Sequence, residues 1–275
     1  MTEDTKKIAI LGAGNIGQAI ANGLISSELF DPGKITITRR RIELLSEYVK
    51  KGFNIGSNNR LAVQFSDIII IAVTPQQLNA LLTDIKNDID ASRHILISIV
   101  SGATTGQIKE ILGKDVPVVR AMPNTAIAIR ESMTCLAASG ETDEVLSHSR
   151  KIFDALGKTL VIEESLMVPA TALCACGIAF FLRAIRAASQ GGIEIGFHAE
   201  DALLMAAQTA KGAASLLVDA ENHPESEVDK VTTPMGCTIS GLNQMEHNGF
   251  SSALIKGIVT SAEKAARLYS PKKDD

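Results

Sequence analysis

Short apolar runs rich in β-branched residues recur through the first half of the chain, and helical patterns separate them. Helical spacing of apolar residues lies near 15–27, 41–51, 76–87, 104–113 and 142–156. The strand-like runs are Lys7–Leu11, Ile35–Thr38, Asp67–Val73, His94–Ile99, Val116–Ala121, Thr134–Ala138 and Lys158–Val161. Strand and helix alternating in this way predict βαβ units and a mostly parallel sheet.

After about residue 164 the strand-like runs disappear, and long segments rich in Ala, Leu, Ile and Met replace them. These segments lie near 171–196, 199–220, 236–247 and 248–268. Between 176 and 190 only Arg183 and Arg186 are charged, so we expect a partner subunit to cover this helix. The predicted fold is an α/β Rossmann domain with a mostly parallel sheet at residues 1–163, followed by an all-helical domain at residues 164–275.

The first apolar run leads into the glycine-rich turn Gly12-Ala13-Gly14-Asn15-Ile16-Gly17. Gly12 permits a tight turn, Gly14 leaves room for a diphosphate beside the backbone, and Gly17 lets the helix pack close to the strand. Free N–H groups at the helix start would bind the anion. Such a motif also occurs in purely structural turns, but the strand before it and the helix after it favour a dinucleotide site.

Basic residues stand where the second strand ends, at the position that distinguishes the two nicotinamide dinucleotides. An acidic residue there binds the ribose hydroxyls of NAD, but the segment 36–41 contains no acid. Thr38, Arg39 and Arg40 are suited to charge-assisted hydrogen bonds with the 2′-phosphate of NADP. The alternative is a solvated basic helix start. The sequence therefore favours NADP(H), with NAD as a possible second cofactor.

Composition argues against several classes of partner. The net charge of −4 provides no basic excess to attract nucleic acid or an anionic membrane. We expect no membrane span and no signal peptide, because no apolar run reaches the required length and the N-terminus is acidic. Cys135, Cys174, Cys176 and Cys237 lack the spacing of metal ligands or of a disulfide framework. A cytoplasmic protein without a metal is the resulting expectation.

Four further segments make the sequence similar to a known enzyme family. They are Ala72–Gln76, Val119–Thr125, Ala206–Ala214 and Asp229–Leu242, the last followed by Glu246 and Gly249. Together with the glycine motif they resemble the pyrroline-5-carboxylate reductase family over about residues 7–268. The resemblance implies NADPH-dependent reduction of 1-pyrroline-5-carboxylate to L-proline, the last step of proline biosynthesis. It also implies that residues 1–163 bind NADP, while residues 164–275 bind substrate and form a homodimer or larger homo-oligomer.

The resemblance also assigns roles to individual positions. The substrate carboxylate would be bound by Thr233, Gly236, Cys237 and Thr238, with Thr238 and Glu221 as catalytic candidates. A loop that feeds a helix start near Thr238 also suits a small carboxylate on physical grounds, although an ordinary N-cap is the alternative reading. The cofactor residues would be Gly12, Ala13, Gly14, Asn15, Ile16, Gly17, Thr38, Arg39, Asn59, Ala72, Val73, Thr74, Pro75, Ser98, Gly102 and Asn124.

The chain departs from the family pattern at the start of the long helical segment. The family carries Ser-Gly-Ser-Gly-Pro-Ala-Tyr where this chain has Cys174-Ala175-Cys176-Gly177-Ile178-Ala179-Phe180. Thiols are weak hydrogen-bonding groups, so we expect polar contacts with the substrate to be lost or shifted. Cys174 and Cys176 could form a redox or metal pair, but small packing residues are the favoured interpretation. Thr74 and Met235 also replace a family lysine and glycine.

Two alternative functions stay open at this point. The altered segment at 174–180 is compatible with a reductase of another small cyclic imine or keto acid, or with a cofactor-binding homologue whose catalysis is weakened. No acid–base pair stands out along the chain. A cyclic imine is basic enough to take its proton from solvent, so the expected task of the protein is to position two ligands and exclude water.

Overall fold

The computed structural model describes residues 6–269 apart from 139, 141 and 219–221, and its contacts divide the chain into two compact units. The first unit comprises Met1–Cys176 and Ser261–Asp275, and the second comprises Gly177–Thr260. The 163/164 boundary expected from the sequence differs from this division, because the segment after residue 163 still packs on the sheet. It stays a prediction.

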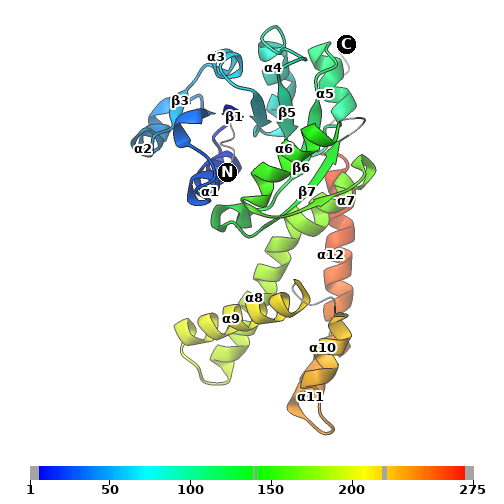
Figure 1. Ribbon diagram of the computed structural model, residues 1–275. Helices are drawn as coiled ribbons and strands as arrows, with labels where there is room; N and C mark the ends of the chain where they lie inside the picture. Colours follow the sequence, from blue (N-terminus) through cyan, green and yellow to red (C-terminus); the bar gives the residue numbers. More distant parts are fainter. Residues whose placement is uncertain (1–5, 139, 141, 219–221, 270–275) are drawn as a thin grey trace. The chain divides into compact units, whose positions relative to one another are not determined.

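The first unit is built around one twisted sheet flanked by helices (Figure 1). Among the described residues the sheet has eight strands in the order β3-β2-β1-β4-β5-β6-β7-β8. The strands are β1 (Ile8–Leu11), β2 (Ile35–Thr38), β3 (Asn54–Gly56), β4 (Ile68–Ile71), β5 (Ile95–Ser98), β6 (Val118–Met122), β7 (Ser132–Ala138) and β8 (Gly157–Val161). Only the pair β6–β7 is antiparallel, so the mostly parallel Rossmann sheet is confirmed.

Helical segments connect the strands of this unit. They are α1 (Asn15–Ser26), η1 (Pro32–Lys34), η2 (Ile42–Leu45), α2 (Ser46–Lys50), α3 (Asn59–Gln64), α4 (Pro75–Ile85), α5 (Thr105–Leu112), η3 (Thr125–Ile129), α6 (Asp143–Asp154), η4 (Glu164–Leu166), α7 (Met167–Ala170) and the π-helical turn η5 (Thr171–Cys176). The single helix expected at 41–51 is therefore divided into η2 and α2, whereas the one expected at 171–196 begins as the π-helical turn η5 and continues without a break to Glu194.

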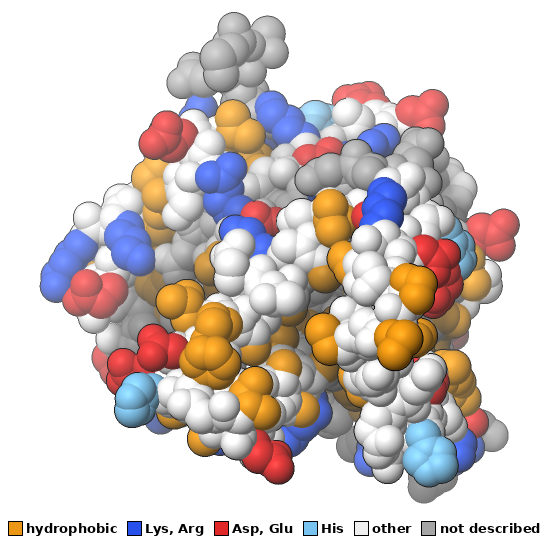
Figure 2. All heavy atoms as spheres, turned by 90° about the horizontal axis from the view of Figure 1, so that it is seen from below, with side chains coloured by type: hydrophobic (Ala, Val, Ile, Leu, Met, Phe, Trp, Pro, Cys, Tyr) orange, Lys and Arg blue, Asp and Glu red, His pale blue; other side chains and the backbone are white. Residues whose placement is uncertain are grey.

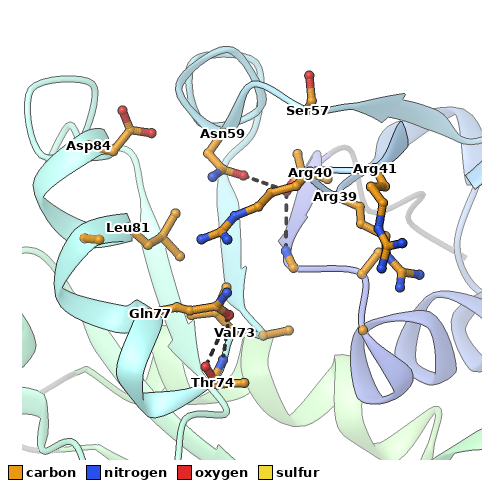
Figure 3. Close-up of a pocket in the computed structure, with 16 residues that line it drawn as sticks. Arg39, Arg40, Arg41, Ser57, Asn59, Val73, Thr74, Gln77, Leu81 and Asp84 are labelled. Atoms are coloured by element: carbon orange, nitrogen blue, oxygen red, sulfur yellow. Dashed lines mark hydrogen bonds between the residues drawn. The ribbon is translucent and has the colours of Figure 1, made fainter. Parts of the chain in front are cut away.

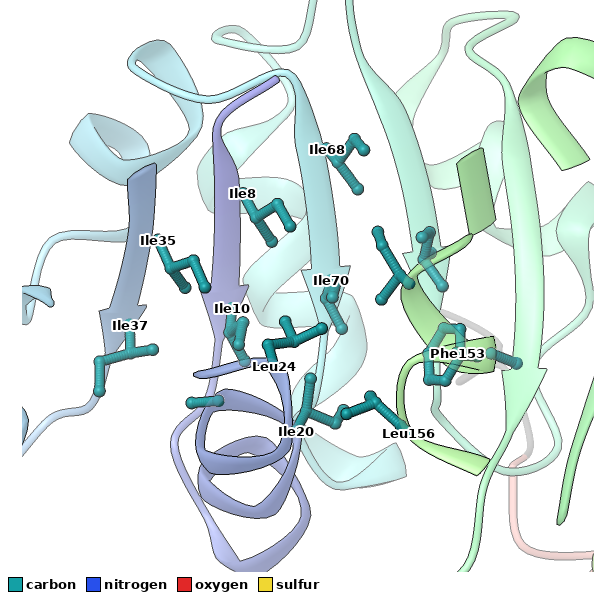
Figure 4. Packing of buried hydrophobic residues seen from close by; sticks show 14 of the residues in the cluster. Ile8, Ile10, Ile20, Leu24, Ile35, Ile37, Ile68, Ile70, Phe153 and Leu156 are labelled. Carbon is teal, nitrogen blue, oxygen red and sulfur yellow. The ribbon is translucent and has the colours of Figure 1, made fainter. Parts of the chain in front are cut away.

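Alternating side chains of the strands build a core on each face of the sheet. Ile8 and Ile10 of β1 belong to one hydrophobic cluster with Leu24 of α1 and Phe153 of α6 on one face of the sheet (Figure 4). Ala9 and Leu11 point to the opposite face, where α3, α4 and α5 supply the cover. The strand β1 is buried on both faces and lies between β2 and β4. The order of the strands reverses at β1, so its carboxyl end marks the switch point of the sheet. Ligands of such sheets bind there.

The second unit is helical throughout its described residues. It consists of α8 (Gly177–Glu194), α9 (Ala199–Val218), α10 (Pro224–Val231), α11 (Cys237–His247) and most of α12 (Phe250–Ala265). The expected all-helical second half is confirmed, with α10 as an addition that the sequence pattern did not reveal.

Large apolar side chains of these helices are not covered by the chain itself. Phe181 and Leu182 of α8 are 60% and 58% exposed, and Leu204 of α9 is 69% exposed. Hydrophobic side chains lie open on the face seen in Figure 2. A monomer rarely leaves this much contiguous apolar surface in water. Burial against a partner subunit, as expected from the sequence, is consistent with this exposure.

One apolar helical stretch corrects an expectation. The continuous helical segment Glu164–Glu194 is long and apolar enough to cross a membrane by length and composition, with 28% of its most apolar window buried in the chain. The expectation that no apolar run reaches the length of a membrane span was therefore wrong. The two charged residues Arg183 and Arg186 do not make this segment polar enough to exclude it. Core helices of soluble proteins and interface helices have the same character, so the absence of a membrane partner stays a prediction.

Candidate active site

The glycine turn between β1 and α1 has the conformation that its three glycines were expected to allow. Gly12 has a φ of +103°, and a Cβ there would lie 2.7 Å from the carbonyl oxygen of Ala72. A Cβ on Gly17 would run into the carbonyl oxygen of Gly12, so the first turn of α1 packs directly on the loop. Gly14 meets nothing within 4 Å and is the N-cap of α1, without a side-chain cap. The N-terminal N–H groups of α1 are therefore open to a ligand.

A cavity of about 650 Å³ lies beside this turn, at the carboxyl ends of β1, β2 and β4 (Figure 3). Its wall includes nine of the expected cofactor residues, namely Gly12, Ala13, Gly14, Thr38, Arg39, Asn59, Ala72, Val73 and Thr74. The volume is within the range of ordinary ligand sites. Residues from widely separated parts of the sequence thus meet at the place where a Rossmann fold binds its dinucleotide.

The polar rim of the cavity is made at the end of β2. Thr38 is buried, and its Oγ1 donates to Oδ1 of Asn59 at 2.7 Å, so its hydroxyl holds Asn59 in place. Arg39, Arg40 and Arg41 all line the cavity. Figure 3 shows Arg40 reaching across the open space toward Leu81, with the guanidinium groups of Arg39 and Arg41 on the opposite side. This concentration of positive charge suits a phosphate group.

Several expected cofactor residues stand next to the cavity rather than in its wall. Asn15, Ile16 and Gly17 form the first turn of α1, and Pro75 is the first residue of α4. Pro75 has no N–H to offer, and it fits the first helical position for that reason. These residues shape the loop and the helix starts that border the cavity.

Ser98, Gly102 and Asn124 are likewise absent from the cavity wall. Ser98 ends β5 and its Oγ accepts from the N–H of Val100 at 3.3 Å. Gly102 has a φ of +90°, and a Cβ there would lie 2.8 Å from Cβ of Tyr269. Tyr269 comes from the end of the described chain and donates to Oδ1 of Asn79 on α4 at 2.7 Å. The loop after β5 is therefore held in place by Tyr269, which is far from it in the sequence.

Asn124 follows β6 and has its side chain engaged locally. Its Oδ1 accepts from the N–H of Ala126 at 3.0 Å, and its Nδ2 donates to the carbonyl oxygen of Cys174 at 3.4 Å. The backbone N–H of Asn124 donates to Oγ of Ser132 at 3.1 Å. Asn124 thus connects the end of β6, the η3 turn and the π-helical turn η5.

The expected substrate residues gather in the second unit, at the turn between α10 and α11. The N–H of Gly236 donates to the carbonyl oxygen of Thr233 at 2.9 Å, and Met235 has a φ of +60°. Gly236 is the N-cap of α11 and no side chain caps the helix, so the N–H groups of Cys237 and Thr238 are open. Thr238 lies within the first turn and is not the N-cap. Glu221 lies outside the described residues.

Sequence reasoning missed part of the cavity and one buried ion pair. Ser57, Gln77, Ala80, Leu81 and Asp84 also line the cavity. Four of these residues, Gln77, Ala80, Leu81 and Asp84, lie on one face of α4. Their spacing of three and four residues is visible in the sequence. Arg120 on β6 is 3% exposed in its side chain and lies 3.5 Å from Glu164. Burial lowers the pKa of Arg120, and Glu164 opposes this shift.

Glu164 is held by a second element as well. Its carboxylate accepts from the backbone N–H and from Oγ1 of Thr105, each at 2.7 Å. The start of the helical segment is thereby joined to the N-terminus of α5 and to β6. Within the described residues no group of three or more His, Cys, Asp or Glu side chains is arranged to hold a metal ion.

Comparison with known proteins identifies both halves of the chain. Residues 7–102 match a family model described as NADP oxidoreductase coenzyme F420-dependent, and residues 164–268 match one described as pyrroline-5-carboxylate reductase dimerisation. The chain is 54% identical over 280 residues to pyrroline-5-carboxylate reductase 1 of Dictyostelium discoideum, covering 98% of this chain but 51% of that protein. It is 49% identical to pyrroline-5-carboxylate reductase 2 of the same organism, covering 96% of this chain and 94% of that protein.

Solved structures agree with these relatives. The pyrroline carboxylate reductase of Plasmodium falciparum with NADP bound has a TM-score of 0.88 at 25% identity, covering 97% of this chain and 99% of that one. The pyrroline-5-carboxylate reductase of Coxiella burnetii has a TM-score of 0.90 at 27% identity, covering 98% and 100%. The chain spans about half the length of the first Dictyostelium relative but nearly all of the second. It therefore belongs to the pyrroline-5-carboxylate reductase family, as a homo-oligomeric oxidoreductase that binds NADP(H) and acts on a small molecule.

Proposed function

We infer that this chain reduces 1-pyrroline-5-carboxylate to L-proline with NADPH, the last step of proline biosynthesis. The observation that carries this inference is the cavity at the end of β1, with an open glycine turn on one side and three arginines on its rim, in a chain of this family. The three residues directly after β2 are Arg39, Arg40 and Arg41, with no acid among them, so the rim favours the phosphate of NADPH over the free hydroxyl of NADH.

We propose the following division of roles in the cofactor site. The residues Gly12 to Gly17 bind the diphosphate through the N-terminal N–H groups of α1. Arg39 and Arg40 bind the 2′-phosphate, and Thr38 orients Asn59 toward the adenosine half. The residues Ala72 to Pro75, together with Ser98, Gly102 and Asn124, form the supports for the nicotinamide half.

The substrate carboxylate is proposed to bind at the start of α11. The open N–H groups of Cys237 and Thr238, the Thr238 hydroxyl and the positive end of the helix dipole all favour a small anion. Thr233 and Gly236 shape the turn that leads into this helix start. Thr238 is the proposed catalytic contact, and Glu221 is proposed with it from the family resemblance alone.

The chemistry requires little acid–base work from the protein. Bound NADPH supplies a hydride to the imine carbon. The imine nitrogen would take its proton from solvent, so that the C=N double bond becomes a C–N single bond with one new C–H and one new N–H bond, and the charges of proton and hydride cancel. The residues of the chain hold the two ligands in reacting distance and keep other water away, which is enough for a large acceleration.

We also propose the oligomeric state and the cellular location of the protein. We propose a homodimer or a larger homo-oligomer built on the helical unit, because its apolar side chains are uncovered in a single chain. A cytoplasmic location is proposed because all four cysteines are free thiols.

A matched pair of substitutions tests the carboxylate site. Thr238→Ala should raise KM for 1-pyrroline-5-carboxylate about tenfold, the value expected for one hydrogen bond to a charged group, and leave KM for NADPH unchanged. Ser251→Ala, an exposed hydroxyl bonded to Glu246, is the control and should change neither. An equal rise in both Michaelis constants would contradict the assignment of Thr238.

The ring size of the substrate is tested with a panel of cyclic imines. Preference for the five-membered ring supports the proposed reaction. Preference for a six-membered ring or a keto acid would favour the alternative reductase that the altered segment at 174–180 left open.

A further inference from the structure

The four cysteines include two that are far apart in the sequence and in contact in the structure. Sγ of Cys135 lies 3.9 Å from Sγ of Cys174. Cys135 points from β7, and Cys174 lies in the π-helical turn η5 that leads into α8. Cys176, two residues away in the sequence, is the neighbour that the sequence pattern suggests for Cys174, but in the structure the Cys174 sulfur lies against Cys135.

We propose that Cys135 and Cys174 form a reversible disulfide that lowers the activity of the enzyme under oxidising conditions. The functional part of this proposal rests on the proposed reductase activity. The bond itself does not, because it follows from the position of the two thiols.

The two thiols lie in a largely apolar environment. Cys135 is 4% exposed and belongs to a small apolar cluster with Met122, Ala137 and Met167, and Cys174 packs against that cluster at the surface. Cys174 is half-buried, so a small oxidant can reach it while Cys135 stays covered. The first attack therefore occurs at Cys174, with Cys135 directly behind it.

The electrostatics of the pair support the same order. Hydrogen bonding by the Cys135 thiol lowers the pKa of Cys174 to about 7, while the same bond and burial raise the pKa of Cys135. Since the thiolate is the nucleophile, the lowered pKa makes Cys174 the more reactive thiol of the pair. Once Cys174 is oxidised its negative charge is gone, and the hydrogen bond that raised the pKa of Cys135 is lost with it.

The chemical steps balance with a hydroperoxide as the oxidant. The Cys174 thiolate attacks one oxygen of hydrogen peroxide, the O–O bond breaks, and Cys174 becomes a sulfenic acid with release of hydroxide. Cys135 then attacks the Cys174 sulfur, and its proton and the hydroxyl group leave as water. Two thiols lose two electrons, and the peroxide is reduced to two waters.

Formation of the bond brings the two sulfurs together, and in the proposed switch the turn that holds Cys174 supplies part of this approach. A disulfide has an S–S distance of about 2.05 Å, so the sulfurs must approach by roughly 1.9 Å. A π-helical turn is irregular and readily rearranged compared with the sheet that holds Cys135. The carbonyl of Cys174 accepts from Asn124, which follows β6 at the proposed nicotinamide end, so the movement is transmitted to the site.

The resemblance described above implies a different residue type at the position of Cys174. The family has serines at the positions of Cys174 and Cys176, as the resemblance describes. A hydroxyl at 174 could accept or donate a hydrogen bond but could not form a covalent bond to Cys135. The exchange of oxygen for sulfur thus supplies a function that the usual residue lacks.

Peptide mapping of the whole enzyme after mild hydrogen peroxide tests the bond directly. We expect a Cys135–Cys174 disulfide, with a loss of two hydrogens, in wild type and in the matched control Cys176→Ser. It should be absent in Cys135→Ser, Cys135→Ala and Cys174→Ser. A Cys174–Cys176 bond, an intermolecular bond, or stepwise oxidation of Cys174 to a sulfinic acid in place of the disulfide would each overturn the proposal.

Turnover of NADPH measures the consequence. We expect oxidation to lower kcat about a hundredfold, the order that misplacement by about 1 Å produces, and dithiothreitol to restore it. Cys135→Ala should keep its activity under the same treatment. A mapped disulfide with unchanged turnover would overturn the switch. Absence of turnover in the fully reduced enzyme would instead contradict the proposed reductase function and leave the mapping result intact.

Discussion

Individual glycines of the β1–α1 turn serve different purposes, and their local contacts separate them. Gly17 has no room for a Cβ because the carbonyl oxygen of Gly12 lies against it, whereas Gly14 has open space. A methyl group at Gly17 therefore destabilises the fold, whereas a methyl group at Gly14 weakens ligand binding. The motif in the sequence does not distinguish these cases.

Gly17→Ala should destabilise the protein by about 1–3 kcal/mol through overpacking, visible as a lower melting temperature without ligand. Gly14→Ala should leave that temperature unchanged but weaken NADPH binding about tenfold or more, since a bound diphosphate approaches the backbone at this point. Thermal unfolding with and without NADPH measures both effects. Equal destabilisation by the two substitutions would contradict separate roles.

The arginines at the end of β2 decide which dinucleotide is favoured. Arg40 reaches into the cavity, so Arg40→Ala should raise KM for NADPH about tenfold or more, the range of a hydrogen bond to a charged group. KM for NADH should hardly change, because NADH carries no 2′-phosphate. Steady-state kinetics with the two cofactors provide the comparison. A similar loss with both would show that Arg40 supports the fold or the diphosphate.

Secondary-structure elements were predicted well where hydrophobic periodicity was strong. The central strands β1, β4 and β5 are short, apolar and buried, so their pattern was unambiguous. The strand β3 was missed because it has three residues, ends in a glycine and is largely uncovered. The π-helical turn at Thr171–Cys176 could not be predicted, because its sequence has the composition of an ordinary helix.

The buried pair Arg120–Glu164 joins three elements of the first unit. Glu164→Ala should destabilise the protein by about 3 kcal/mol, because it leaves the Arg120 guanidinium buried without its carboxylate. Glu164→Gln retains hydrogen-bonding atoms and should cost less. The neighbouring Glu163→Ala removes an exposed carboxylate and serves as the control. Urea unfolding gives the free energy of unfolding of the three variants. An equal loss in Glu164→Ala and Glu163→Ala would contradict a stabilising role of the ion pair.

Long-range contacts of the candidate site were accessible only through the structure. The glycine turn, the arginines and the α11 turn could be named from motifs and family resemblance. The hydrogen bond from Thr38 to Asn59, the support of Gly102 by Tyr269 and the contact of Cys135 with Cys174 join residues that no local pattern relates. These contacts depend on how strands and helices meet in space.

At the scale of the whole molecule, the uncovered apolar helices account for the homo-oligomer. Leu182→Arg should place a charge in the buried interface and shift the protein toward monomer, measured by sedimentation velocity. NADPH binding should persist, because the residues that line the cavity beside the glycine turn all belong to the first unit. Leu29→Arg changes an equally exposed leucine of the first unit and should leave the oligomer intact. A Leu182→Arg protein with the wild-type sedimentation coefficient would contradict this interface.

We have proposed that this chain couples an NADP site to the reduction of a cyclic imine carboxylate. This is tested by the reaction of the purified, reduced protein with NADPH and 1-pyrroline-5-carboxylate, with both products quantified. We expect one L-proline for each NADPH oxidised, and much slower turnover with NADH. A folded oligomer that binds NADPH but forms no proline would contradict it.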